Sequence, residues 1–389
     1  MNRNGYHVEV LDTKGRHIVE KGLRYVHNDA CYPAVLVIGQ LLDALEGGKY
    51  DPDRVALMLM QTGGGCRASN YVSLLRKALQ RAGHENVPVL SFNLVGIEKN
   101  PGFQLTLPLL IKMLYAVLFG DLLMTLTQRT RPYDTEPGAA ERLAEQWTNR
   151  LVCEMQKSRV KLPYRSVKEL YAEIVRDFAA LPLSGEQKPR VGIVGEIFVK
   201  FSPLGNNNLE DFLISEGAEP VMPGLLDFCL YVVCNSIFDA KLYGLRRVQG
   251  AVYRIAYRYL LKKQRDLIAA IRSNSNFTPP TDFAHTRSLV DGYMHVGAKM
   301  GEGWLLTAEM LELIDSGTKN VICTQPFGCL PNHIVGKGVM KHIRETHPDA
   351  NLIAIDYDPS ATAINQENRI KLMLANAARQ AQEEPKRGI

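Results

Sequence analysis

The segment CTQPFGCLPNH, residues 323–333, contains the side chains of this chain that point most directly to chemistry. Its two thiols, Cys323 and Cys329, follow the segment KNVI. Thiolates bind zinc and iron–sulfur clusters, and two thiols can form a redox disulfide. Two buried, inert thiols would give the same pattern. The separation is wider than the usual Cys-x-x-Cys of a zinc knuckle, so it disfavours a local zinc site.

Two more cysteines lie in turns. Cys66 ends LMLMQTGGGC, between a predicted strand and a predicted helix, and Cys31 precedes another predicted helix that has Pro33 in its first turn. The dipole and free N–H groups of a helix start favour the thiolate that a metal or cluster needs. The remaining cysteines lie in helical or apolar segments, where a free thiol behaves as a small hydrophobic residue: Cys153, Cys229 and Cys234.

Glycines accompany two of the turn cysteines, because QTGGGC and TQPFGC both end in Gly-Cys after an apolar strand. Glycine lets the backbone approach a cluster and leaves N–H groups free to bond its sulfides. Ligands from distant segments suit a cluster held between domains, so we favour an iron–sulfur site over zinc, redox thiols or inert cysteines. We predict supporting roles for Gly63, Gly64, Gly65, Gly328, Asn332 and His333. A helix cap or a solvent-exposed position is the simpler alternative for His333.

The elements that must position these residues alternate between helix and strand in the first third of the chain. Helices are expected over residues 31–48 and 69–83, and apolar strands over 54–62 and 87–95. This alternation of strands and helices is typical of a doubly wound parallel sheet, which binds ligands at the carboxyl ends of its strands. We therefore expect the turn cysteines at such an edge.

The rest of the chain reads as a helical region followed by two further α/β segments. Strands are expected near residues 190, 219, 320 and 351, and one long helical tract over 225–270. SNSNFTPPTD marks a boundary by its Ser, Asn and Pro content. The predicted divisions are 1–185, an α/β domain with a helical extension; 186–275, an α/β segment with long helices; 276–382, a C-terminal α/β segment; and 383–389, a tail.

Composition disfavours several classes of function. The net charge is +5 and basic residues are interleaved with acidic ones, so nucleic-acid binding gains no support. The N-terminal segment lacks the apolar stretch of a signal peptide, and seven cysteines in a cytosolic chain argue against a disulfide framework.

The apolar window 105–126 contains Lys112 and Asp121, which favours a buried core helix over a membrane span. We expect a cytoplasmic protein without nucleic-acid or membrane partners.

Several long motifs resemble one family: QTGGGCRASNY, VGEIFVKFSPLGNNNLEDFL and CTQPFGCLPNHIVGKGVMKHIR are the clearest, and the likeness runs from Gly22 to Ala377. The chain is similar to the cysteine-rich C-terminal portion of the large activase-like proteins related to 2-hydroxyacyl-CoA dehydratases. This resemblance implies flavodoxin-like domains that lend cysteines to a central [4Fe–4S] or larger cluster. It implies Cys31, Cys66 and Cys323 as the leading ligands, with Cys329 as a fourth ligand or a nearby thiol.

The resemblance also implies a partner. In the family this portion is often fused behind ATPase domains of the acetate-kinase, Hsc70 and actin type, and those domains are not recognisable in this sequence. A separate ATPase subunit is therefore the expected partner, and a homodimer stays open. The leading hypothesis is an iron–sulfur component that handles low-potential electrons in an ATP-driven system, such as a 2-hydroxyacyl-CoA dehydratase-like enzyme or a related reductase.

Two other functions stay open from the sequence. One is a non-catalytic α/β scaffold that carries structural zinc or no metal and docks an ATPase. The other is a nucleotide-binding enzyme. The glycine-containing stretch VGIVGEIFVKFSPLGNNN matches neither the Walker nor the dinucleotide fingerprint, which counts against that enzyme.

Overall fold

The structure is a computed structural model that describes residues 5–27, 29–92, 103, 105–157, 162–244 and 247–383. It has a mixed α/β fold with two parallel sheets, as the alternating sequence pattern predicts. The predicted tail at 383–389 lies outside the described residues except for its first residue, which ends α15. The end of the strand predicted at 87–95 also lies outside them.

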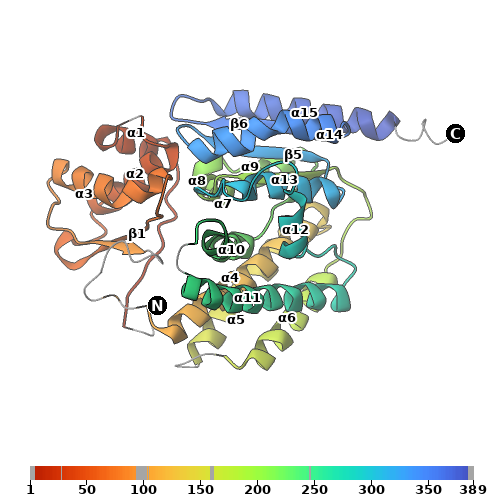
Figure 1. Cartoon of the computed structure of the whole chain (residues 1–389), viewed down its shortest axis with the longest axis horizontal. Helices are drawn as coiled ribbons and strands as arrows, with labels where there is room; N and C mark the ends of the chain where they lie inside the picture. The colour runs from red at the N-terminus through yellow and green to blue at the C-terminus, as the bar shows by residue number, and fades with distance from the viewer. Residues whose placement is uncertain are drawn as a thin grey trace.

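The first residues form a small α/β unit, drawn in red and orange in Figure 1. Its strands pair in parallel, and its apolar helix faces bury Ile38, Leu42 and Leu75. Cys31 is the residue before α2, and Pro33 lies in the first turn of that helix, as predicted. The elements are α1 (Arg16–Tyr25), α2 (Tyr32–Glu46), β1 (Leu57–Met60), α3 (Tyr71–Arg81) and β2 (Val89–Phe92).

A four-stranded parallel sheet with the order β4-β3-β5-β6 forms the second α/β unit. Its strands are β3 (Arg190–Gly195), β4 (Glu219–Val221), β5 (Asn320–Pro326) and β6 (Asn351–Tyr357). Its connecting helices are α7 (Ile197–Phe201), α8 (Pro203–Asn206), α9 (Leu209–Ser215), α12 (Phe283–Leu289), α13 (Trp304–Asp315), α14 (Met340–Thr346) and α15 (Ala363–Glu383). The centre of this sheet is buried, and β5 is inaccessible over almost its whole length.

Long helices pack below this sheet in Figure 1. They are α4 (Leu107–Thr130), α5 (Ala139–Lys157), α6 (Tyr164–Ala179), α10 (Leu225–Leu242) and α11 (Arg247–Asn274). The helical tract expected over 225–270 consists of α10 and α11. Leu118, Leu122 and Leu126 of α4 are fully buried in the shared core. By length and composition alone α4 could cross a membrane, a criterion that core helices of soluble proteins also meet.

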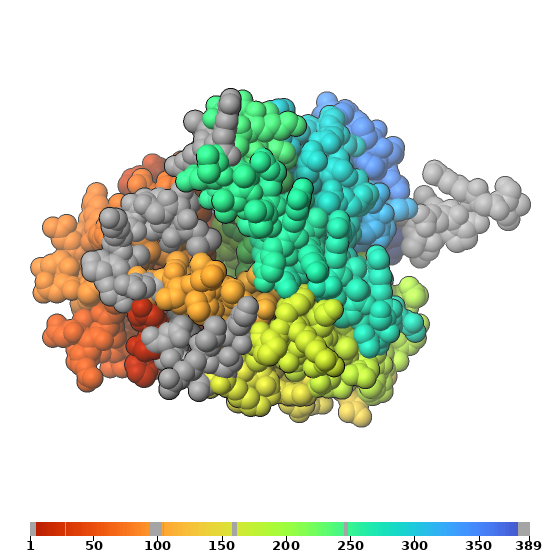
Figure 2. All heavy atoms as spheres, turned by 60° about the horizontal axis from the view of Figure 1, so that its bottom comes forward, coloured from red at the N-terminus to blue at the C-terminus, as the bar shows by residue number. Residues whose placement is uncertain are grey.

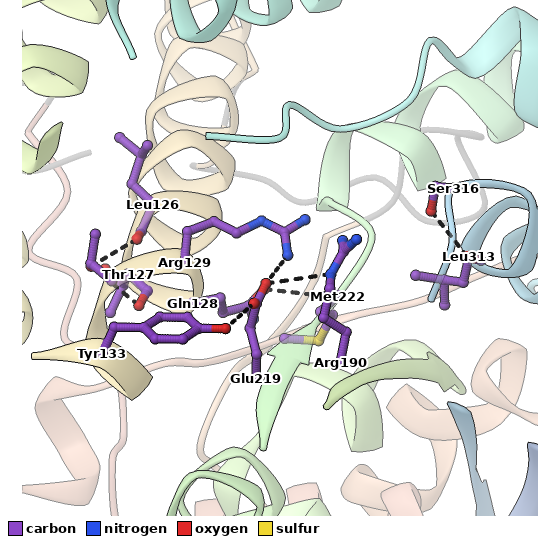
Figure 3. A network of polar contacts seen from close by, with 11 residues as sticks. Leu126, Thr127, Gln128, Arg129, Tyr133, Arg190, Glu219, Met222, Leu313 and Ser316 are labelled. Carbon is purple, nitrogen blue, oxygen red and sulfur yellow. Dashed lines mark hydrogen bonds and ion pairs between the residues drawn. The ribbon is translucent and has the colours of Figure 1, made fainter. Parts of the chain in front are cut away.

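The helices and the sheet are interlocked across the predicted domain boundaries. One hydrophobic core contains side chains of α4 and α6 from before residue 185 and of α10 and α11 from after it. Glu219 at the start of β4 accepts a hydrogen bond from Tyr133 (2.7 Å) and pairs with Arg129 and Arg190 (Figure 3). This buried carboxylate ties the end of α4 to the edge of the sheet.

Asp121 gives a pH-dependent contribution to this packing. Its carboxylate accepts hydrogen bonds from the backbone N–H groups of Leu225 and Leu226, each at 2.8 Å, at the start of α10. Burial nevertheless raises the pKa of Asp121 from 3.8 to about 6. The unfolded chain therefore releases this proton at lower pH than the folded protein does, so ionisation favours unfolding.

We predict that the free energy of unfolding falls as the pH rises from about 4 to about 6, by up to about 3 kcal/mol from Asp121 alone. Asp121→Asn cannot ionise and should lack this contribution. Urea unfolding across that pH window should show the wild-type stability declining relative to the variant. A constant difference between the two proteins would contradict the assignment.

Candidate functional site

Three of the turn cysteines line one large cavity. Cys31, Cys66 and Cys329 face a space of about 1370 Å³ that lies among both α/β units and the helices. Cys31 precedes α2, Cys66 follows β1, and Cys329 follows β5. The segments are far apart in the sequence, and the fold places their cysteines on the walls of the same cavity.

Backbone contacts fix the turns that carry these thiols. The N–H of Tyr32 donates to the carbonyl oxygen of Phe327 at 2.9 Å, which docks the start of α2 on the turn after β5. The N–H of Gly65 lies 3.1 Å from the sulfur of Met300. A Cβ placed on Gly301 would lie 3.9 Å from the sulfur of Cys66 and 2.8 Å from Pro331. The turns of Cys66 and Cys329 thus meet at residues 300–301, and the turn of Cys31 docks separately on residues 327–328.

The cavity lies where the strand order of the larger sheet reverses. From β3 the chain moves to β4 on one side, and later to β5 on the other side. Glu196 directly follows β3, and Cys329 lies just beyond β5. Open α/β sheets bind ligands in the crevice at the carboxyl ends of the two strands that flank such a reversal. The expectation of turn cysteines at a strand edge fits this geometry.

Cys323 does not join the other three. It is fully buried inside β5 and packs in a core cluster with Met310 and Ile343. Burial raises its pKa to about 12. Its thiol lies 3.6 Å from the side-chain oxygen of Asn332, and the amide nitrogen of Asn332 donates to the sulfur of Cys329 at 3.4 Å. Asn332 therefore connects the core thiol with the cavity thiol.

The other predicted supporting residues divide between the cavity and its surroundings. Gly328 lines the cavity beside Cys329. Gly64 and Gly65 pack against Met300, and Gly63 is exposed next to them. His333 is exposed, and its Nδ1 lies 2.6 Å from the side-chain nitrogen of Gln325. Gly328 packs against the turn of Cys31, and Asn332 and the backbone N–H of His333 contact Cys329.

Gly328 is a position where a side chain should be costly. Its φ is +74°, and an added Cβ would lie 3.1 Å from the Cα of Cys31 and 3.3 Å from the oxygen of Ala30. A matched control exists at Gly83, which has φ +77° and no atom within 4 Å of an added Cβ. We predict that Gly83→Ala costs about 1–2 kcal/mol from the left-handed backbone alone. Gly328→Ala should cost about 1–3 kcal/mol more because backbone atoms obstruct the methyl group.

Urea unfolding of the two glycine variants measures this difference. Equal destabilisation would mean that the turn of Cys31 and the turn of Gly328 can separate without cost. That outcome would weaken the inference that the two turns form one rigid site.

Two buried carboxyl groups that the sequence analysis missed also line the cavity. Glu196 accepts from the N–H of Val199 at 2.8 Å, and Glu302 accepts from the N–H of Ile197 at 2.9 Å, so both hold the start of α7. Burial and then the neighbouring charge of Glu302 raise the pKa of Glu196 to about 8. Burial also raises the pKa of Glu302. The sequence VGEIF, which follows a predicted strand, could have identified Glu196 as a candidate. No sequence pattern near Glu302 indicates that it lines a cavity.

Tyr71 is the third residue that the sequence analysis missed. Its hydroxyl lies 2.8 Å from the sulfur of Cys31, close enough for a hydrogen bond. Burial raises the pKa of Cys31, of Cys66 and of Cys329. Neutral thiols are therefore favoured until a cation binds, and a bound metal would have to displace their protons.

The remaining walls of the cavity are mostly apolar. Met58 and Met60 contribute from β1, Phe198 from α7, and Leu225 and Phe228 from α10. Apolar walls offer no hydrogen bonds and lower the local dielectric constant, which strengthens charge interactions near the thiols.

Three thiols line this cavity. Among the residues that the structure describes, no group of three or more His, Cys, Asp or Glu side chains could hold one ion. Thiolates on a single zinc ion each lie about 2.3 Å from it, so they must be close to one another. A cluster would place iron and sulfide between its thiolates, so its thiolates need not all reach one atom.

Comparisons with known proteins supply no relative for this chain. Protein-family models, curated proteins and solved structures were compared with it, and none matches.

Proposed function

We propose that the chain is an iron–sulfur protein that handles low-potential electrons in an ATP-driven reductive system. The observation that carries the proposal is the convergence of Cys31, Cys66 and Cys329 on one cavity. Cysteine thiolates are the usual attachment of such clusters, and these three reach the cavity from distant segments.

In this proposal the three cavity thiols hold a [4Fe–4S] or larger cluster. The chain would hold it in an apolar cavity, with the Tyr71 hydroxyl next to the Cys31 sulfur and the Asn332 amide donating to the Cys329 sulfur. Hydrogen bonds to ligating sulfurs and exclusion of water tune reduction potential. When bound, a cluster with three cysteine ligands would supply an electron and one open iron for a substrate oxygen.

The finer description of the fold belongs to this proposal. The order β4-β3-β5-β6 is second, first, third and fourth along the chain, which is how a flavodoxin-like sheet begins. Together with the resemblance to the 2-hydroxyacyl-CoA dehydratase-related proteins, this order supports flavodoxin-like domains with an inserted helical region. The same resemblance supports a separate ATPase partner of the acetate-kinase, Hsc70 and actin type.

The test is elemental analysis of protein that is expressed and purified without oxygen. Iron and acid-labile sulfide in near-equal amounts, with a paramagnetic resonance signal after reduction, are the expected result. Zinc without sulfide would overturn the proposal in favour of a scaffold with a structural metal. Absence of metal after reconstitution with iron and sulfide would overturn it as well.

A further inference from the structure

The first half of α11 presents an apolar seam to solvent. Val248, Val252, Ile255 and Tyr259 have exposed fractions of 84%, 63%, 70% and 42%. Their spacings of four, three and four residues place them along one side of the helix. Figure 2 shows α11, in green to teal, running across the molecular surface. Single exposed apolar residues are ordinary, whereas a continuous row of them marks a contact surface.

The seam is not needed to hold α11 in place. The second half of the helix buries Leu261, Leu267 and Ile271 in the helical core, and α11 packs extensively against α10 and α6. The exposed first half continues this anchored helix and packs against α10 at Gly250. An apolar surface on a packed helix loses little conformational entropy when a partner covers it.

Cations follow the seam along one flank. Arg254, Arg258 and Lys262 stand at four-residue steps. Residues 247–262 contain no Asp or Glu. Within the described part of the chain, none of the three cations forms an ion pair with a carboxylate. Three unpaired cations beside an apolar row form a surface that is complementary to an acidic one.

We propose that this face of α11 binds an acidic amphipathic helix of another protein. The spacing of the seam is that of alternating heptad positions, and Val and Ile there suit packing against a second helix. Carboxylates on the partner's flank would meet Arg254, Arg258 and Lys262 and would set the choice and orientation of the partner. This inference is independent of the metal at the thiol cavity.

The observations favour a protein helix over the other occupants. In a pair of identical chains, the segment 247–262 would bring cations but no carboxylate to the interface. Helices that lie on membranes present a wide apolar face with Trp, Phe or Leu, whereas this seam is narrow and mostly β-branched. An acidic helix satisfies both the apolar row and the cationic flank.

The test uses two fluorescent designed peptides with the same heptad apolar positions and the same length. One peptide carries Glu at its flanking positions and the other carries Lys. Fluorescence anisotropy with the intact protein should show the acidic peptide binding at least about tenfold more tightly, with an affinity that falls as salt rises. Val252→Ser/Ile255→Ser should abolish binding without changing the circular dichroism spectrum, because both residues are exposed.

A charge reversal makes the test independent of any loss of folding. Arg254→Glu/Arg258→Glu should invert the preference and bind the basic peptide more tightly. Equal affinity for both peptides, or binding of neither, would overturn the proposal. A dimer in sedimentation that dissociates on Val252→Ser, or binding to anionic phospholipid vesicles without peptide discrimination, would assign the seam to a second copy or to a membrane instead.

Discussion

Cys31→Ala, Cys66→Ala and Cys329→Ala should each lose most of the iron that the wild-type protein carries after anaerobic purification. Each removes a thiol that lines the cavity. Substituting a residue that only hydrogen-bonds a metal ligand typically costs about 10–100-fold in affinity, and losing a ligand should cost at least as much. Tyr71→Phe and Asn332→Ala should therefore give intermediate losses, since they remove hydrogen-bond partners of the sulfurs and not the sulfurs. Iron and sulfide content per chain measures all of these effects.

Cys323→Ala and Cys153→Ala are the matched controls. Cys153 is exposed on α5, and Cys323 is in the core of β5, away from the cavity. Both variants should keep their iron, although Cys323→Ala should be less stable because it leaves a small gap in a fully buried strand. If Cys323→Ala lost iron and Cys329→Ala retained it, the ligand set implied by the family resemblance would be preferred to the one that the cavity indicates.

The sequence pattern predicted the parallel α/β elements well because strand periodicity and glycine stops are local signals. β1, β5 and β6 each lie within segments whose apolar runs end at a turn. The helical tract predicted over 225–270 corresponds to α10 and α11. Apolar and basic residues continue across their junction, so Gly244 is the local signal for the end of the first helix. The core that α4 and α10 share depends on contacts between residues far apart in sequence, which no local pattern indicates.

The sequence indicated the candidate site only through its cysteines and glycines. Turn cysteines next to glycine were predicted to follow strands, and Cys66 and Cys329 do so. Whether Cys323 or Cys329 faces the cavity depends on which of the two lies inside the strand. Because β5 continues to Pro326, Cys323 points into the core and Cys329 falls in the turn beyond the strand. Tertiary packing brings Glu302 and Tyr71 to the cavity, and no short sequence pattern predicts such packing.

Lys200→Met should destabilise the protein by about 3–5 kcal/mol at neutral pH. Lys200 on α7 donates to both carboxylate oxygens of Glu309 on α13, at 2.9 and 3.2 Å, and both side chains are almost fully buried. Removing the lysine leaves a buried carboxylate without a cation. Burial raises the pKa of Glu309, and Lys200 opposes that shift. Without Lys200, Glu309 should be protonated more readily as the pH falls, so the loss in free energy of unfolding should be smaller at low pH. Urea unfolding at two pH values measures both effects.

The double variant Lys200→Met/Glu309→Met separates the charge from the packing. Replacing a buried ion pair with apolar residues of similar volume is often neutral or stabilising, so the double variant should recover most of the stability. Equal instability of the single and double variants would instead assign the loss to packing. The pair also joins two walls of the cavity, because Glu196 lies at the start of α7 and Glu302 just before α13. Iron binding should therefore fall in the single variant and return in the double one, since the thiols depend on the position of these walls and not on the charge of Lys200.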